Sequence, residues 1–287
     1  MTKVRNRKET FLQGILTLMF AQVIIKILGL IYSLYLTNRD GFGDSGNAIY
    51  MGGYQIYAML LTLSSTGVPN AISKLISEKL AVEDIKGANR IFKIAFLTFA
   101  VIGISGTSLL FFGADIIANQ WLQIPEAKYT LMVLSPAIFF VSVSSVIRGY
   151  FNGKEKMSIT AKSQTFEQVF KTSLTIIFVE IFARMTSMNT ELMAAGATLA
   201  TTVATIISFT YIYKMTKVIK KEESKNIVTL SQNKNTNNKE SIKSIIKKIL
   251  AVSIPISLSS LLSSVNKNID SFTVVRLLKP ILRRKCC

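Results

Sequence analysis

The stretch that decides the fold is FLQGILTLMFAQVIIKILGLIYSLYL, residues 11–36. About 20 apolar residues at about 1.5 Å rise per residue cross a bilayer core of about 30 Å, so this segment is long enough to span a membrane. A basic segment precedes it, as in a signal peptide. The apolar run is nevertheless too long for a signal-peptide core and lacks a small-residue cleavage site. We therefore predict an uncleaved first transmembrane helix.

Lys26 lies close to the middle of this predicted helix. An ammonium near the bilayer centre costs on the order of 3 kcal/mol. The nearer interface is about 11 Å away, further than a lysine side chain comfortably reaches. The sequence therefore favours a Lys26 that faces a bundle interior or a hydrated cavity, where a partner or an anionic ligand offsets its charge. The alternative is a lysine that the helix simply tolerates.

The composition is that of a membrane protein with several spans. The chain has 287 residues, of which 49% are hydrophobic, and a formal net charge of +18. In a soluble protein this charge would indicate nucleic-acid binding. Here the apolar residues fall into long runs, which places the charge in loops beside a membrane, and no nucleic-acid partner is predicted.

Few residues that carry chemistry are present. Histidine is absent, and the only cysteines are Cys286 and Cys287, so the sequence offers no histidine base, no disulfide framework and no zinc site. It also contains no phosphate-binding loop and no catalytic constellation. We predict neither an enzyme nor a cofactor.

The apolar pattern predicts an all-α integral membrane fold. The expected spans are residues 11–36, 48–68, 94–112, 131–147, 166–182, 192–213 and 249–275. This pattern divides the chain into a six-helix transmembrane lobe at 1–214, a flexible basic cytoplasmic linker at 215–246, and a seventh transmembrane helix with its tail at 247–287. Between the second and third spans, one helix face gathers apolar side chains and predicts a helix lying on the cytoplasmic surface. These side chains are Ile72, Leu75, Ile76 and Leu80.

The distribution of lysine and arginine predicts the orientation. These residues gather in the N-terminal segment and in the segments 74–93, 148–171 and 214–248, which alternation of the helices places on one side. The loops on the other side hold only Arg39, Lys128 and Arg184. Because cytoplasmic loops carry the excess of positive charge, the N-terminus is expected in the cytoplasm. The predicted location is the bacterial cytoplasmic membrane.

Several residues within the spans have a packing interpretation. Gly196, Ala200 and Ala204 recur every four residues and predict a close approach to a neighbouring helix. Pro136 is expected to free a carbonyl group and bend its helix. Glu180 and Arg184 are spaced for a local ion pair.

Tyrosines gather on one face of the second span, at its outer end. They are Tyr50, Tyr54 and Tyr57. One interpretation is an aromatic belt at the membrane interface. The other is a surface that stacks on sugars inside a cavity, with Tyr54 as the candidate binding residue.

Residues 135–171, SPAIFFVSVSSVIRGYFNGKEKMSITAKSQTFEQVFK, carry a compound motif. An Arg-Gly-Tyr-Phe-x-Gly turn closes the fourth span, a Met-x-x-Thr-Ala segment follows, and a Glu-Gln pair opens the fifth span. These residues are Arg148, Gly149, Tyr150, Phe151, Gly153, Met157, Thr160, Ala161, Glu167 and Gln168. With STGVPNAISKLISE at 65–78 and the Lys-Ile-Leu-Gly that begins at Lys26, this pattern resembles the polysaccharide-export and stage V sporulation protein B branch of the multidrug/oligosaccharidyl-lipid/polysaccharide (MOP) flippases.

The resemblance implies a transporter of two six-helix lobes, of which this chain holds the N-terminal one, around a cavity that opens alternately to either side. The implied partners are an undecaprenyl-linked glycan, such as the peptidoglycan precursor lipid II, and membrane lipid. The implied substrate-binding residues are Lys26, Tyr54 and Arg148. A second cation is expected a turn or two beyond Lys26, where this chain has Tyr32 and Ser33.

Alternatives remain open. Arg148 also fits a plain cytoplasmic anchor, with Gly149 and Gly153 forming the turn between helices. The leading function is flipping of lipid-linked saccharides. A drug or cation antiporter of the same superfamily is the second candidate, although such antiporters usually need a buried carboxylate and the first four spans contain none. A merely structural, nonfunctional membrane fragment is the third. The oligomeric state stays open.

The C-terminal end departs from the rest of the pattern. Alternation of the helices places it outside, yet it is crowded with positive charge and ends in PILRRKCC. This violates the charge rule that the earlier loops obey. We therefore expect a truncated or frame-shifted chain in which the residues from about Pro280 onward are not family sequence.

Overall fold

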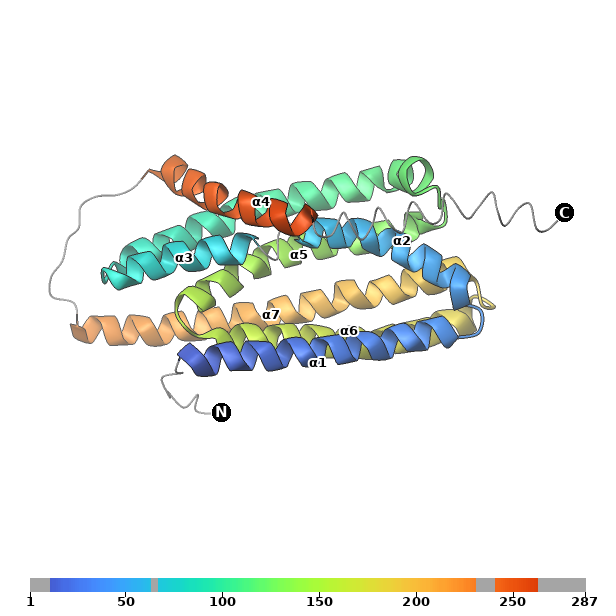
Figure 1. The fold of residues 1–287 in the computed structure, drawn as a ribbon, viewed down its shortest axis with the longest axis horizontal. Coiled ribbons are helices and arrows are strands. Elements are labelled where there is room, and N and C mark those ends of the chain that lie inside the picture. Colours follow the sequence, from blue (N-terminus) through green and yellow to red (C-terminus); the bar gives the residue numbers. More distant parts are fainter. Residues whose placement is uncertain (1–10, 63–66, 231–240, 263–287) are drawn as a thin grey trace.

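The protein is described by a computed structural model that covers residues 11–62, 67–230 and 241–262. The described residues form helices joined by short turns and contain no strand (Figure 1). In chain order the elements are α1 (Phe11–Asn38), α2 (Gly43–Thr62), α3 (Val68–Ala81), α4 (Ile85–Ile116), the π-helical turn η2 (Ile117–Leu122), α5 (Ala127–Gly153), α6 (Met157–Met185), α7 (Thr190–Leu230) and an unlabelled helix, Ile242–Leu262. The predicted all-α fold is confirmed.

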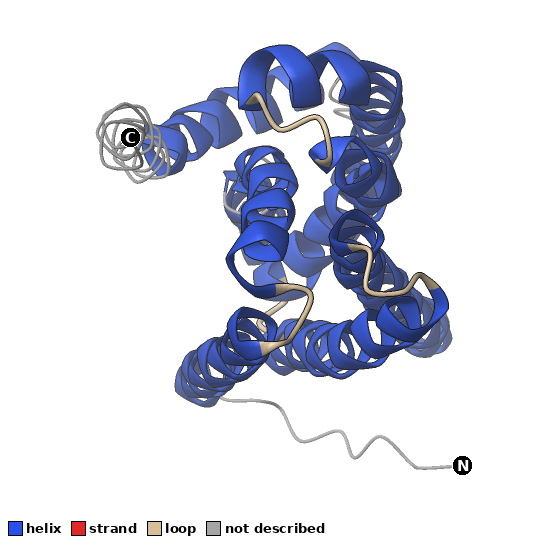
Figure 2. Ribbon diagram, turned by 90° about the vertical axis from the view of Figure 1, so that its right-hand side faces the viewer, coloured by secondary structure: helices blue, strands red, loops and turns tan. Residues whose placement is uncertain are grey.

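The helices run nearly parallel to one long axis, as the view along that axis shows (Figure 2). α5 lies at the centre, where it packs against α2, α3, α4 and α7, while α6 packs between α1 and α7. In the most apolar window of α5, 72% of the residues are buried, against 11% for α1. α1 is therefore an edge helix that leaves most of its surface outside the lobe.

Five of the described helices are long and apolar enough to cross a membrane. They are Leu12–Asn38, Ile85–Leu122, Ala127–Gly153, Thr190–Lys221 and Ile242–Leu262. The predicted third and fifth spans, 94–112 and 166–182, are each part of longer helices, α4 and α6. The part of the predicted seventh span beyond residue 262 lies outside the described residues.

The predicted surface helix is in fact part of the bundle. α3 covers this segment, and its Ile72 and Ile76 are fully buried against α5. On α5, a Cβ at Gly149 would lie 2.9 Å from the Ile72 Cβ, and one at Gly153 would lie 2.9 Å from the Ile76 Cβ. The prediction of a cytoplasmic surface helix is therefore wrong, because the apolar face of α3 packs against the glycines of α5 and not against lipid.

The two glycines also differ from their predicted role. α5 continues as a helix through Gly149 to Gly153, and the turn follows at Lys154–Lys156, where Glu155 has a φ of +58°. The glycines do not make the turn. They let α3 and α5 approach each other closely, as small residues do in membrane helix pairs.

Part of the segment predicted as a linker is helical. α7 continues to Leu230, so residues 215–230, expected in the linker, are helical. Ile219 of α7 and Ile245 and Ile249 of the helix Ile242–Leu262 are buried in one apolar cluster with α3, α4 and α5. These apolar residues explain why helix persists at both ends of the predicted linker. Residues 231–240 lie outside the described part of the chain.

Hydroxyl groups compensate for Pro136, which leaves the Met132 carbonyl without its helical N–H partner. Ser135 Oγ donates to that carbonyl oxygen at 2.8 Å, and Thr202 Oγ1 of α7 donates to the Val133 carbonyl oxygen at 2.7 Å. The predicted freeing of a carbonyl at Pro136 is confirmed. The predicted close approach of the small-residue face is also seen, since a Cβ at Gly196 would lie 2.7 Å from the Phe182 ring.

Glu180 of α6 pairs with a residue far away in the sequence. Its carboxylate accepts from Arg39 Nε at 2.8 Å, from Arg39 Nη2 at 3.0 Å and from the Tyr35 hydroxyl at 2.8 Å. This hydrogen bonding raises the pKa of the Arg39 guanidinium. The predicted local pair with Arg184 is wrong, and Glu180 instead ties α6 to the end of α1.

Candidate functional site

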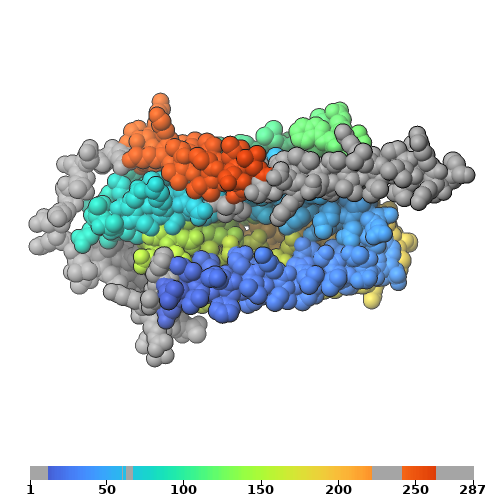
Figure 3. All heavy atoms as spheres, in the orientation of Figure 1, coloured from blue at the N-terminus to red at the C-terminus, as the bar shows by residue number. Residues whose placement is uncertain are grey.

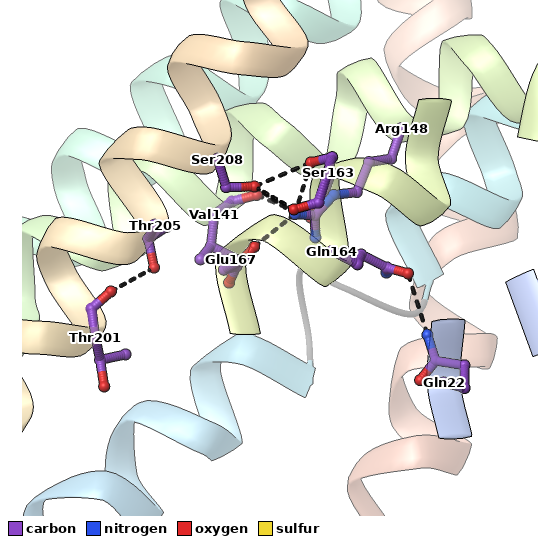
Figure 4. A network of polar contacts seen from close by, with 10 residues as sticks. Gln22, Val141, Arg148, Ser163, Gln164, Glu167, Thr201, Thr205 and Ser208 are labelled. Carbon is purple, nitrogen blue, oxygen red and sulfur yellow. Dashed lines mark hydrogen bonds and ion pairs between the residues drawn. The ribbon is translucent and has the colours of Figure 1, made fainter. Parts of the chain in front are cut away.

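Lys26 lies on the outer side of α1. Its side chain is exposed and forms no ion pair with any described residue. One turn earlier, Gln22 Nε2 donates to Gln164 Oε1 of α6 at 3.1 Å (Figure 4). Lys26 is therefore not in the interior of this lobe. None of the described residues supplies a negative charge that pairs with its ammonium.

Besides Arg148, the lobe buries the cation of Lys171, which sequence reasoning counted among cytoplasmic loop residues. It lies at the midpoint of α6, and only 5% of its surface is exposed. Its Nζ donates to the Tyr54 hydroxyl at 3.0 Å. The same atom lies 4.2 Å from the Tyr54 ring centroid and 5.1 Å from that of Tyr32. Aromatic faces and a hydroxyl oxygen thus surround the ammonium.

The position of Lys171 is relevant to the second cation that the resemblance leads one to expect on α1, where this chain has none. Tyr32 stands where the resemblance leads one to expect a basic residue, and the ammonium of Lys171 lies close to its ring. A signal for Lys171 was present in the sequence, because Glu167, Lys171 and Thr175 follow one another at i, i+4 spacing within the predicted fifth span.

The tyrosines of α2 point into the lobe. Tyr50 is fully buried, Tyr57 is 2% exposed, and the rings of Tyr50 and Tyr54 stack with centroids 5.6 Å apart. An aromatic belt needs rings at the membrane interface, so that interpretation is wrong for Tyr50 and Tyr57. Tyr54 is half-buried beside Lys171, which keeps it a candidate binding residue.

Arg148 occupies a separate polar cluster that joins three helices (Figure 4). Its Nη2 lies 2.6 Å from Glu167 Oε2 of α6, 3.3 Å from Ser163 Oγ and 3.3 Å from Ser208 Oγ of α7. The two serine oxygens are 2.9 Å apart. With 8% of its surface exposed, Arg148 is held inside the lobe and is not a cytoplasmic anchor.

The three predicted site residues thus lie in three settings. Lys26 is on the outer side of α1, Tyr54 is beside Lys171, and Arg148 is in the cluster with Glu167. Sequence reasoning assigned Lys171 to no site and named Glu167 only as part of the family motif, without its partner Arg148. The described residues contain no group of three or more Cys, Asp or Glu side chains that could hold a metal ion.

Comparison with known proteins identifies the family. The model of the polysaccharide biosynthesis protein family matches residues 11–281. The chain belongs to this family. Stage V sporulation protein B of Bacillus subtilis (strain 168) is 32% identical over 216 residues, which cover 74% of this chain and 41% of that protein. Lipid II flippase MurJ of the same organism is 28% identical over 183 residues, covering 60% of this chain and 33% of that protein.

Solved structures share the fold of this polysaccharide biosynthesis family member. A MATE transporter in complex with Br-NRF superposes with a TM-score of 0.71 at 17% identity and covers 89% of this chain and 56% of its own. A MOP superfamily transporter from Pyrococcus furiosus gives a TM-score of 0.67 at 18% identity, with coverage of 87% and 52%. The described helices therefore form a MOP-type lobe in a multi-pass membrane protein. The chain spans less than half the length of the curated relatives named above.

Proposed function

We propose that this chain is the N-terminal lobe of a transporter that moves lipid-linked saccharides across the cytoplasmic membrane by alternating access. The observation that carries the proposal is Lys26, a cation that forms no ion pair with any described residue and lies halfway along an apolar edge helix, facing out of the lobe. An intramembrane cation of this kind normally faces a partner or a water-filled pathway. Membership of the polysaccharide biosynthesis family and the similarity to lipid II flippase MurJ support a lipid-linked glycan as the substrate.

In this mechanism Lys26 binds the pyrophosphate of an undecaprenyl-linked glycan. The sugar passes through a polar cavity of the transporter, while the lipid tail stays in the bilayer. An ammonium attracts pyrophosphate more strongly in a low-dielectric setting than in water. The concentration of lysine and arginine in alternate segments supports a cytoplasmic N-terminus, so that loading of the substrate takes place at the cytoplasmic side.

The test is a flipping assay on the 287-residue chain in proteoliposomes that contain a fluorescent undecaprenyl-pyrophosphate saccharide. Lys26→Ala is expected to lower the initial rate about tenfold or more, since loss of a charge-assisted contact to phosphate costs about 1.5–3 kcal/mol. Lys26→Arg should retain most of the rate. Lys93→Ala removes another exposed lysine, on α4, and should leave the rate unchanged.

Two results would oppose the proposal. Wild-type chain that moves lipid no faster than empty vesicles would favour the nonfunctional fragment. Full activity of Lys26→Ala would remove Lys26 from the substrate path.

A cation antiporter is the second candidate, because α6 contributes a carboxylate, Glu167, that the first four spans lack. Glu167 Oε2 lies 2.6 Å from Arg148 Nη2, so this carboxylate is already engaged in an ion pair inside the lobe. Ethidium efflux driven by a pH gradient in the same proteoliposomes would favour the antiporter. We expect no such efflux.

A further inference from the structure

The Lys171 ammonium is buried without an anion. It has three hydrogen-bond donors, and within the described part of the chain it makes one hydrogen bond, to the Tyr54 hydroxyl, and no ion pair. Buried charges in proteins are normally paired, because an unpaired charge in a low-dielectric interior is strongly destabilising. Aromatic faces offset part of this cost. The remaining donors point to a partner that the described residues do not supply.

Two buried hydroxyl groups, one a helical turn from Tyr54 and the other a helical turn from Lys171, make no hydrogen bond among the described residues. Tyr50 Oη and Thr175 Oγ1 belong to fully buried residues and make no hydrogen bond within the described helices. Tyr50 lies one turn before Tyr54 on α2, and Thr175 lies one turn after Lys171 on α6. Because α2 and α6 run in opposite directions, both hydroxyl groups lie on the same side of the Lys171–Tyr54 contact (Figure 1). A buried hydroxyl group that makes no hydrogen bond is uncommon in native proteins and needs an explanation.

The aromatic residues around Lys171 lead toward the surface. Tyr32 and Tyr54 are both half-buried, whereas Tyr50 behind them is fully buried. The space-filling view shows a recess between α1 and the pair α2 and α3, with yellow-green atoms of the α6 region at its floor (Figure 3). The two rings that contact the Lys171 ammonium, those of Tyr32 and Tyr54, are thus partly accessible from the surface of the lobe.

We propose that Lys171, Tyr50, Tyr54 and Thr175 form a binding site for a phosphate oxyanion. Lysine binds phosphate as a point charge. The unpartnered hydroxyl groups of Tyr50 and Thr175 supply two further donors on one side of the ammonium. The oxyanion is either free pyrophosphate or the headgroup of a lipid. Where it is the headgroup of a transported lipid, the inference rests on the proposed function and adds a second cation, on α6, to Lys26 on α1.

The test is calorimetric titration of the full chain with inorganic pyrophosphate in nanodiscs of phosphatidylcholine. Wild type is expected to bind, and Lys171→Met is expected to weaken binding about tenfold or more, the effect of a lost charge-assisted contact. Lys171→Arg should retain binding. Repeating the titration in nanodiscs that contain phosphatidylglycerol distinguishes the sources. Competition by this lipid assigns the site to lipid phosphate, and equal binding assigns it to a water-soluble phosphate.

The sharpest variants are Tyr50→Phe and Thr175→Val, since each removes a hydroxyl group that makes no hydrogen bond to any described residue. Each should weaken pyrophosphate binding about threefold to tenfold, the value of one hydrogen bond. The unfolding temperature should stay level or rise, because no internal hydrogen bond is lost. Thr201→Val is the matched control: it removes an unpartnered buried hydroxyl from α7 and should change neither property.

Wild-type binding in Tyr50→Phe and Thr175→Val would overturn the proposal, even if Lys171→Met destabilises the protein. Absence of pyrophosphate binding by wild type in both kinds of nanodisc would also overturn it. Flipping is measured separately with Lys26 variants, so a failure of transport with intact pyrophosphate binding would reject the proposed function and leave this site standing.

Discussion

Arg148→Ala is expected to lower the free energy of unfolding by about 3–5 kcal/mol, the cost of removing one partner of a buried ion pair. The Arg148 side chain is 9% exposed and lies 2.6 Å from Glu167, which is 24% exposed. Without the guanidinium, the Glu167 carboxylate and the hydroxyl groups of Ser163 and Ser208 lose their shared donor. Chemical unfolding in detergent micelles, followed by circular dichroism, measures the difference.

The matched variant removes both charges. Arg148→Met combined with Glu167→Leu should recover most of the lost stability, because an apolar pair of similar volume avoids the uncompensated charge. A double variant as unstable as Arg148→Ala would show that the ion pair is not the source of the cost. If Arg148 also binds substrate, as the family resemblance implies, the double variant should fold well and still transport poorly.

Gly149→Leu is expected to cost on the order of 3 kcal/mol or more, which makes it the second large effect. A Cβ at this position would lie 2.8 Å from the Pro69 carbonyl oxygen and 2.9 Å from the Ile72 Cβ. The first of these is backbone, so the side chain fits only if α3 moves away from α5. Thermal unfolding of the chain in detergent should show a clearly lower midpoint than wild type.

Gly113→Ala is the control for this substitution. Gly113 is also in a long helix, α4, but its nearest contact to an added Cβ is the Ile117 Cδ1 at 3.7 Å. Alanine there should be neutral or stabilise the helix by about 1 kcal/mol. If Gly149→Leu has the same unfolding midpoint as wild type, α3 does not pack on α5. That result would support the surface position that the sequence predicted for this helix.

Much of the fold could be predicted because membrane spans depend on local composition. The run at residues 11–36 predicted a spanning helix, and α1 forms there. The carbonyl freed at Pro136 and the close approach at Gly196 are as predicted, since a missing N–H and a missing side chain act on their immediate surroundings whatever the neighbour. The motif around Arg148 pointed to the family that the comparisons show.

The errors share a physical cause. Helical periodicity shows which residues lie on one face of a helix but not what that face meets. The apolar face of α3 could meet lipid or another helix equally well, because both are apolar, and Gly149 and Gly153 of α5 decide the matter. Glu180 likewise had a local partner in sequence, yet the fold brings Arg39 closer.

Sequence alone therefore determined that this is a polytopic helical membrane protein with an intramembrane cation, because length, apolarity and charge act within one segment. Tertiary structure alone decided that Lys26 faces outward and that Lys171, counted as a loop lysine, is buried beside Tyr54. Burial of a charge depends on which helices surround it. That is a property of contacts between segments far apart in the sequence, and no local pattern encodes it.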